Sequence, residues 1–318
     1  MIQVVDIYPP LNKKEHYPDV VLATGFFDGV HRAHQQVIRR AKEIAQQRQL
    51  PLAVMTLTPH PAVVYHGVPA NEYLYLSPRN RKIELMKKFG VDLLYIVHFT
   101  PEFAQLTPQA FVDQYLIGLH AQVVVAGFDY TFGDPALANM DTLPQLAHDR
   151  FTVVTVPCVK DDYDHHKIGS SQIRQLITTG KIDLANQRLG YCYQTSGIVV
   201  HGDARGRQLG FPTANIVSDA QQLLPGVGIY AVELFFDNQW HHAMASVGHD
   251  VTFGNHPLSV EVYVFDYNGD LYDRHVKIRW YHYLRDEIKF ANVDDLITQL
   301  HHDETDVRHY FKIIAKEY

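Results

Sequence analysis

The feature that most constrains this chain is a change of hydrophobic pattern part-way along it. From residue 20 to residue 159, short continuous apolar runs alternate with segments at helical spacing. After residue 193, apolar runs instead follow one another, separated by turn residues. Alternation of the first kind predicts a parallel sheet covered by helices on both faces, and consecutive strands predict an antiparallel barrel. We therefore expect an α/β domain followed by a β domain.

In the first part, apolar runs predict strands at 20–24, 52–57, 93–99, 122–127 and 152–157. Helices are expected between them, at 33–48, 78–89, 108–119 and 143–149. This order predicts a doubly wound, Rossmann-like sheet. A chain of 318 residues is long enough for two domains of ordinary size, and we place them at 1–186 and 187–318.

In the second part, strands are expected at 196–201, 228–235, 242–247, 258–266 and 275–283. Turn signals such as Asp237-Asn238, Gly254-Asn255 and Asn268-Gly269-Asp270 separate them, which is typical of a small antiparallel β-barrel. Residues 294–316 carry apolar side chains near helical spacing, so one or two terminal helices should pack on the barrel.

Composition excludes several classes of function. A formal net charge of −7 argues against a general nucleic-acid-binding protein. The N-terminus lacks a signal-peptide pattern, and no apolar run is long enough for a membrane span. Cys158 and Cys192 show no metal spacing and are expected to be reduced. Three His pairs lack a third ligand at a recognisable spacing and are expected on the surface: 165–166, 241–242 and 301–302. We expect a cytoplasmic protein without membrane or nucleic-acid partners.

Polar and glycine-rich segments follow four of the strands predicted in the first part. They lie at 25–34, 59–61, 127–133 and 169–174. In a parallel sheet the carboxyl ends of the strands meet at one edge, where ligands bind. These segments therefore predict a binding site.

His31 and His34 lie three residues apart at the start of a predicted helix, so their rings can share one face. Spacing alone leaves three alternatives open: a metal-binding pair, a structural pair, or a phosphate site at the positive end of the helix. In the last case Gly25 and Gly29 would shape the turn. Ser170 and Ser171 are typical helix caps, and a cap can also bind an anion.

Residues 197–216 form a strand that runs into a glycine-rich, basic loop. Glycines at 202, 206 and 210 would let backbone N–H groups approach a phosphate, and arginines at 205 and 207 add positive charge. Thr213 and Asn215 place two neutral oxygen ligands one residue apart, which suits Mg²⁺. The alternative is a basic hairpin loop without a ligand.

Glu261 stands out within the strand predicted at 258–266. Val260, Val262 and Val264 share one face of that strand, and Glu261 lies on the other. A carboxylate there must be paired or solvated, so Glu261 is either part of a site or an edge-strand residue facing water. Arg285 could pair with Glu287 or reach a flavin or a phosphate.

Four segments carry a resemblance to a known family. Residues 206–215, Gly-Arg-Gln-Leu-Gly-Phe-Pro-Thr-Ala-Asn, resemble the flavokinase signature. Residues 25–34 and 170–174 resemble the two signatures of the FAD synthetase branch of nucleotidylyltransferases. Residues 284–290 match the flavokinase Leu-Arg-x-Glu-x-Lys-Phe segment. Over nearly its whole length the chain resembles the prokaryotic bifunctional riboflavin kinase/FMN adenylyltransferase (FAD synthetase) family.

The resemblance implies that the first domain adenylylates FMN to FAD, that the second phosphorylates riboflavin to FMN, and that both use ATP with Mg²⁺. It implies a catalytic base at Glu261 and Mg²⁺ ligands at Thr213 and Asn215. Catalytic roles in adenylyl transfer fall to His31, His34 and Arg174. The other residues that it assigns to nucleotide or flavin binding are Gly25, Phe27, Asp28, Gly29, His60, Asp129, Ser170, Ser171, Gly202, Arg207, Gly210 and Arg285.

Two alternatives remain beside this interpretation. Ala33 stands where the family usually has glycine, so the chain could be a riboflavin kinase with a weakened or inactive adenylyltransferase domain. Residues 247–253 also lack the arginine and proline that the family usually has there. The second alternative is a flavin- or nucleotide-binding regulator without turnover. The sequence does not predict an oligomeric state.

Overall fold

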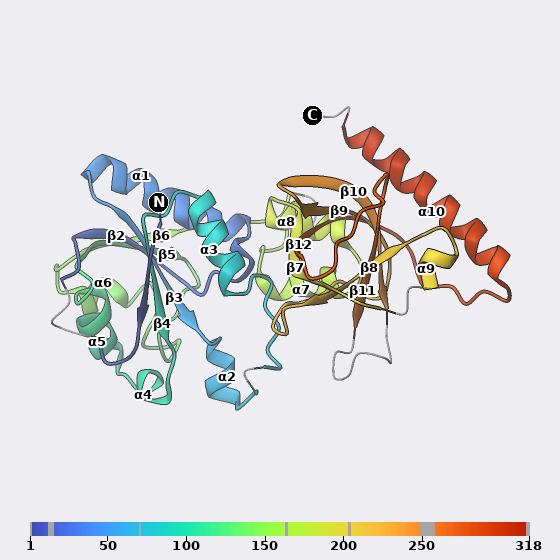
Figure 1. The fold of residues 1–318 in the computed structure, drawn as a ribbon. Coiled ribbons are helices and arrows are strands. Elements are labelled where there is room, and N and C mark those ends of the chain that lie inside the picture. Colours follow the sequence, from blue (N-terminus) through green and yellow to red (C-terminus); the bar gives the residue numbers. More distant parts are fainter. Residues whose placement is uncertain are drawn as a thin grey trace. The chain divides into compact units, whose positions relative to one another are not determined.

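The computed structural model describes residues 2–11, 16–69, 71–162, 165–202, 205–248 and 258–315, without the side chains of Arg205 and Gln208 (Figure 1). The chain divides into two compact units, Met1–Ser170 and Ser171–Tyr318. The functional boundary after residue 186 stays a prediction. The predicted turn Gly254-Asn255 lies outside the described residues. So does most of segment 247–253, which lacks the arginine and proline usual in the family.

The first unit is built on a six-stranded parallel sheet in the order β1-β4-β3-β2-β5-β6. Its strands are β1 (Gln3–Ile7), β2 (Val20–Thr24), β3 (Leu52–Thr58), β4 (Leu93–His98), β5 (Ala121–Gly127) and β6 (Thr152–Val156). Five of these strands match the predicted ones. The hydrophobic pattern did not predict β1, an edge strand whose side chains are mostly half-buried or exposed.

Helices cover both faces of this sheet, which confirms the doubly wound prediction. Helix α1 (Arg32–Arg48) packs on β2, β3 and β5. On the opposite face, Phe111, Tyr115 and Leu116 share a core cluster with Leu22 and Val124. The remaining helical segments are η1 (Asp28–Val30), α2 (Pro61–His66), α3 (Arg79–Lys88), α4 (Pro101–Ala104), α5 (Pro108–Phe111), η2 (Val112–Leu116) and α6 (Leu143–Ala147).

The order of the strands places a topological switch point beside β2. From β2 the chain continues to β3 on one side, and it later returns to β5 on the other side. Ligands of such sheets bind in the crevice at the carboxyl ends of the strands where the order reverses. The segment 25–34 leaves the carboxyl end of β2, and Asp129 follows the end of β5.

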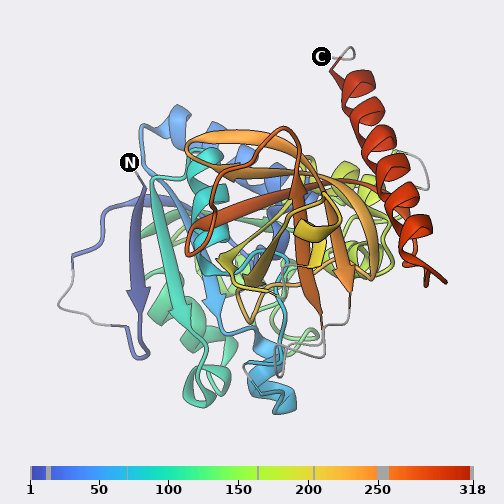
Figure 2. The same cartoon turned by 45° about the vertical axis from the view of Figure 1, so that its right-hand side comes forward.

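The second unit contains a closed antiparallel barrel in the order β10-β11-β8-β7-β12-β9, as predicted (Figure 2). Its strands are β7 (Tyr193–Val200), β8 (Thr213–Ser218), β9 (Gly228–Phe236), β10 (Gln239–Gly248), β11 (Ser259–Val264) and β12 (His275–Arg285). Strand β8 was not predicted from the hydrophobic pattern. The helices of this unit are α7 (Ser170–Thr178), α8 (Ile182–Leu189), α9 (Arg205–Gln208) and α10 (Val293–Ile314).

Helix α10 forms the predicted terminal helix and packs on the outer wall of the barrel. Val307 and Phe311 contact a buried cluster that includes Phe211, Ala231 and Met244. Within the described ranges, no helix is both long and apolar enough to cross a membrane.

Candidate active sites

Pairing between strands brings the predicted kinase residues onto one face of the barrel wall. Thr213 lies opposite Tyr263, and Asn215 lies opposite Glu261. Paired residues on neighbouring strands point to the same side of a sheet. Because the alternate residues Val260 and Val262 are buried, this shared side is the one away from the barrel interior.

The same arrangement tests whether Glu261 is an edge-strand residue. Strand β11 pairs with β10 on one side and with β8 on the other, so it has no free edge. Glu261 is only half-buried, and its Oε2 atom accepts a hydrogen bond of 2.9 Å from Oγ1 of Thr213. The edge-strand alternative is therefore wrong, and the predicted alternation along the strand is confirmed.

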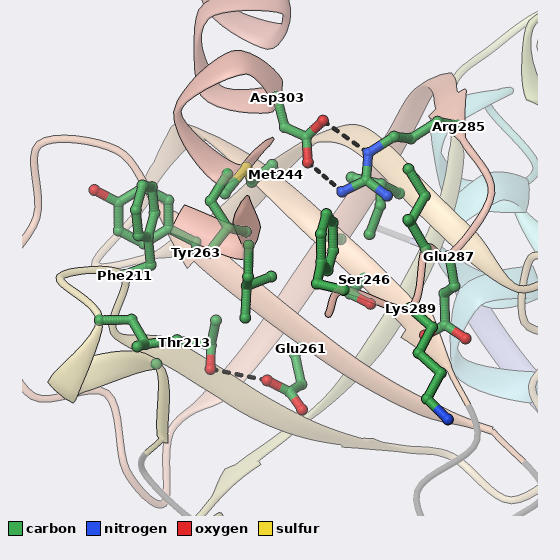
Figure 3. A pocket seen from close by; sticks show the side chains of 18 residues that line it. Phe211, Thr213, Met244, Ser246, Glu261, Tyr263, Arg285, Glu287, Lys289 and Asp303 are labelled. Carbon is green, nitrogen blue, oxygen red and sulfur yellow. Dashed lines mark hydrogen bonds and ion pairs between the residues drawn. The ribbon is translucent and has the colours of Figure 1, made fainter. Parts of the chain in front are cut away.

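A cavity of about 620 Å³ opens in front of these residues (Figure 3). Thr213 and Glu261 lie at one side of it in the view, and Arg285 with Asp303 lies at the other. The cavity is large enough for a drug-sized ligand. Its apolar wall consists of Leu209, Phe211, Met244, Tyr263, Ile288, Phe290, Leu296 and Leu300.

The glycines before β8 allow the backbone to pack closely against the site residues. A Cβ atom added at Gly202 would lie 2.6 Å from Cγ of Asn215, and one at Gly206 would overlap the carbonyl oxygen of Phe211. Gly210 has a φ of +83°, which disfavours other residues. Gly202 and Gly206 therefore have no room for a larger side chain, whereas Gly210 is constrained by its backbone conformation alone. The side chain of Arg207 is exposed to solvent.

Arg285 is held by a buried carboxylate of α10. Its Nε and Nη2 atoms donate to the two oxygens of Asp303 at 2.9 and 2.5 Å. Asp303 is 2% exposed and also accepts a hydrogen bond from Gln299. Among the described residues the carboxylate partner of Arg285 is Asp303, so the alternative pairing with Glu287 is wrong.

In the first unit, Asp28 anchors the loop after β2 to the segment before α3. This residue is 2% exposed, and its carboxylate accepts hydrogen bonds from the backbone N–H groups of Leu76 and Ser77 at 3.2 and 3.0 Å. The N–H of Gly29 donates to Oγ of Ser77 at 2.7 Å. Phe27 and Gly29 both have positive φ angles, so the loop turns sharply between β2 and α1. Asp28 therefore fixes the shape of the loop.

His31 and His34 lie together at the start of α1. Nδ1 of His31 accepts a hydrogen bond of 3.4 Å from the backbone N–H of His34, and the two rings stack with centroids 3.6 Å apart. Burial lowers the pKa of His31 to about 4 and the pKa of His34 well below its usual range. Both rings are thus neutral at pH 7. Because Nδ1 of His31 is an acceptor, its proton lies on Nε2.

The groups around His31 and His34 help to distinguish a metal site from a site for another ligand. Within the described ranges, no group of three or more His, Cys, Asp or Glu residues could hold a metal ion. Nδ1 of His34 is buried without a hydrogen-bond partner among those residues. An orphaned polar atom of this kind is consistent with a site completed by a ligand.

The other residues predicted for nucleotide or flavin binding occupy several positions. Oγ of Ser170 donates to the backbone oxygen of Asp28 at 2.9 Å. Asp129 is exposed and forms an ion pair with Lys167. His60 caps α2 and stacks on Tyr73 with ring centroids 4.5 Å apart. The roles of Ser171 and Arg174, which lie on α7 in the second unit, stay predictions.

The sequence patterns used above did not identify the buried charges of Lys82 and Asp303. Lys82 is 6% exposed and Asp303 is 2% exposed. A signal existed for both, because each lies at helical spacing from buried apolar residues. Lys82 shares the buried face of α3 with Leu85 and Met86, and Asp303 lies four residues before the buried Val307 of α10.

Comparison with known proteins agrees with the division of the chain into two units. The FAD synthetase family model matches residues 13–172, and the riboflavin kinase family model matches residues 189–311. The crystal structure of a protein described as a macrolide-efflux protein from Streptococcus pneumoniae has a TM-score of 0.88 to this chain at 36% identity. It covers 96% of this chain and 98% of its own.

Named relatives match over almost the whole chain. A bifunctional riboflavin kinase/FMN adenylyltransferase from Listeria monocytogenes is 45% identical, covering 98% of each chain. The enzyme of the same name from Bacillus subtilis is 38% identical, covering 95% of this chain and 96% of its own. The chain therefore belongs to the bifunctional riboflavin kinase/FMN adenylyltransferase family.

Proposed function

We propose that this chain converts riboflavin to FAD in two ATP-dependent steps. The second unit transfers the γ-phosphoryl group of ATP to riboflavin, and the first unit transfers the adenylyl group of a second ATP to FMN. The observation that carries the kinase assignment is the hydrogen-bonded pair of Thr213 and Glu261 beside the 620 Å³ cavity. The family matches in both halves of the chain support the two-step function.

In the kinase step, Glu261 acts as the general base. Its carboxylate takes the proton of the riboflavin 5′-hydroxyl group while that oxygen bonds to the γ-phosphorus of ATP and the bond to ADP breaks. The hydroxyl group of Thr213 donates to Glu261, which orients the carboxylate. The apolar wall around Tyr263 and Met244 suits the flat flavin ring.

Thr213 and Asn215 fit a Mg²⁺ ion that is bound together with ATP. The hydroxyl group of Thr213 donates its hydrogen bond to Glu261, so the lone pairs of its oxygen remain available to a cation. The amide oxygen of Asn215 is a second neutral ligand of the type that Mg²⁺ accepts beside phosphate oxygens and water. When bound, Mg²⁺ would neutralise charge on the transferred phosphoryl group.

The loop of residues 202–210 is proposed to hold the ATP phosphates through its backbone N–H groups, with Arg207 adding charge. Arg285 has a different proposed role. The buried carboxylate of Asp303 neutralises the charge of Arg285, so this charge is not free for a phosphate. The ion pair instead links α10 to the end of β12 and fixes the wall of the cavity opposite Thr213 and Glu261. This assignment replaces direct phosphate binding by Arg285.

In the adenylyl-transfer step, the FMN phosphate attacks the α-phosphorus of ATP and pyrophosphate leaves. The nucleophile is already an anion, so positioning and neutralisation of charge account for most of the catalysis. His31 donates its Nε2–H to a phosphate oxygen, and His34 lies beside it. Gly25 allows close approach of the nucleotide to the turn, and Asp28 holds the turn rather than the ligand.

The proposed roles of the remaining residues depend on the same site. Ser170 fixes the backbone of Asp28, while Ser171 and Arg174 contribute to anion binding. His60 and Asp129 border the flavin and nucleotide pockets, and Phe27 packs against the ring of His34. The family resemblance supports all of these assignments. For Ser170, His60, Asp129 and Phe27 it is joined by their positions after strands of the first unit, and for Ser171 and Arg174 it stands alone.

Ala33 favours a second candidate function, that of a riboflavin kinase alone. Ala33 lies in the first turn of α1, where alanine stabilises the helix but adds a methyl group beside the proposed triphosphate site. The test is to incubate the chain with riboflavin, ATP and Mg²⁺ and to separate riboflavin, FMN and FAD by chromatography. FAD supports the two-step function, FMN alone supports the kinase, and no product supports a regulator. A parallel incubation that starts from FMN isolates the second step.

A further inference from the structure

Lys82 is a buried cation beneath the loop that follows β2. It lies on α3 with 6% exposure, and its ammonium group donates to the backbone oxygen of Phe26 at 2.9 Å. A second hydrogen bond of 3.3 Å reaches Oγ1 of Thr56 on β3. The ammonium group also lies 4.2 Å from the centroid of the Phe26 ring, within cation–π range.

These contacts join Lys82 to the clamp that holds the loop. The segment before α3 already binds the loop through Ser77, which contacts Asp28 and Gly29. Lys82 adds a contact one residue before Phe27, whose left-handed backbone starts the turn. Because Oγ1 of Thr56 also donates to the oxygen of Phe26 at 2.8 Å, this carbonyl keeps one partner when Lys82 is replaced.

A buried lysine costs free energy unless its charge has a use or a counter-charge. The carboxylate of Asp28 supplies partial compensation, yet burial still lowers the pKa of Lys82 to about 8. Its positive charge also contributes to lowering the pKa of His34, so the field of Lys82 reaches the His31–His34 pair. A polyanionic nucleotide at that pair would supply the missing negative charge.

We propose that Lys82 is a positioning residue for adenylyl transfer, which fixes the loop of residues 25–30 and places a buried positive charge beneath the bound triphosphate. This inference rests on the proposed adenylyltransferase function of the first unit. It concerns a residue outside the two sequence signatures, on a helix that contributes none of the residues assigned above.

Two variants separate the hydrogen bond from the charge. Lys82→Met removes both with little change of shape, and Lys82→Gln keeps a donor without the charge. For Lys82→Met we expect kcat/KM for FMN adenylylation to fall about 100-fold, the size of effect that a misplaced site produces. Riboflavin kinase activity, which belongs to the other unit, should stay unchanged. Lys42→Gln is the matched control, because Lys42 of α1 is a half-buried lysine that donates to a different backbone oxygen, that of Phe89.

The dependence of adenylylation on pH distinguishes a positioned charge from a packing role. The described charged and titratable groups that face Lys82 are the carboxylate of Asp28 and the neutral ring of His34. As pH rises through about 8 the ammonium group loses its proton, so kcat/KM of the wild type should fall there. This decline should be absent from Lys82→Gln and Lys82→Met, and retained in Lys42→Gln.

Amide hydrogen exchange gives a readout that is independent of turnover. In Lys82→Met, the amides of residues 25–34 should exchange faster than in the wild type, while those of the barrel should not change. Unchanged exchange in this loop would overturn the inference, and so would a Lys82→Met enzyme with the activity and pH profile of the wild type. If the wild type does not adenylylate FMN, the proposed function fails, and the exchange measurement still decides whether Lys82 holds the loop.

Discussion

Gly202→Ala is predicted to disable the kinase by moving Asn215. A Cβ atom at this position would lie 2.6 Å from Cγ of Asn215 and 2.9 Å from its Oδ1. Non-bonded carbon atoms pack at about 3.5–4.0 Å, so an overlap of about 1 Å must be relieved. Either the amide of Asn215 leaves its place opposite Glu261, or the loop of residues 202–210 moves outward.

Both responses separate groups that the proposed kinase mechanism requires together. A displacement of about 1 Å in a catalytic arrangement can cost 10²-fold in rate, so we expect kcat/KM for riboflavin phosphorylation to fall about 100-fold. Adenylylation of added FMN occurs in the other unit and should be unchanged. Steady-state assays with riboflavin or FMN as substrate, resolved by chromatography, measure the two activities in one preparation.

Gly210→Ala is the control within the same loop. A Cβ atom there meets no atom within 4 Å, but the φ of +83° imposes backbone strain. Left-handed backbone costs a non-glycine residue about 1–2 kcal/mol, so this variant should be less stable without displacing Asn215. Kinase activity should exceed that of Gly202→Ala at equal folded concentration. A Gly202→Ala enzyme that phosphorylates riboflavin at the wild-type rate would refute the role given to Asn215.

The remaining predictions concern stability. Asp303→Asn removes the charge that pairs with Arg285 in a buried site, so the free energy of unfolding should fall by about 3–5 kcal/mol, measured with urea. Asp237→Asn, which breaks the exposed pair with Arg274, should lower the free energy of unfolding much less, because water screens an exposed pair. Equal losses from the two variants would show that burial of the pair does not matter. The pKa of His31 is about 4 when folded against an ordinary 6.5, so the unfolded state binds more protons between these values. Stability should therefore decline by about 3 kcal/mol as pH falls from 6.5 towards 4, a loss that His31→Asn should reduce.

The sequence predicts the layers of the fold well because its buried strands are continuous and apolar. Strands β2 to β5 are covered on both faces, and their residues are nearly all buried. The two strands that were missed lack this signal. β1 lies at a sheet edge, and in β8 only Ile216 is fully buried, so neither shows a clear hydrophobic pattern.

The candidate sites were predictable only in part. Residue type and spacing single out Thr213, Asn215 and Glu261, and family resemblance gives them roles. Neither reveals that the three residues share a face. These side chains come close together because of the register between β8 and β11, which a closed barrel fixes through long-range pairing. The partners of Lys82 and Asp303 are likewise distant in sequence, so local patterns mark these charges as buried without showing what they bind.

Glu261 is proposed to serve the kinase alone, while adenylyl transfer is proposed to use a separate site in the first unit. The most direct measurement is product analysis of Glu261→Gln, supplied either with riboflavin and ATP or with FMN and ATP. FMN formation should fall by about 10²–10⁴-fold, the usual contribution of a general base, while FAD still forms from FMN. Normal conversion of riboflavin to FMN by this variant would show that Glu261 is not the base.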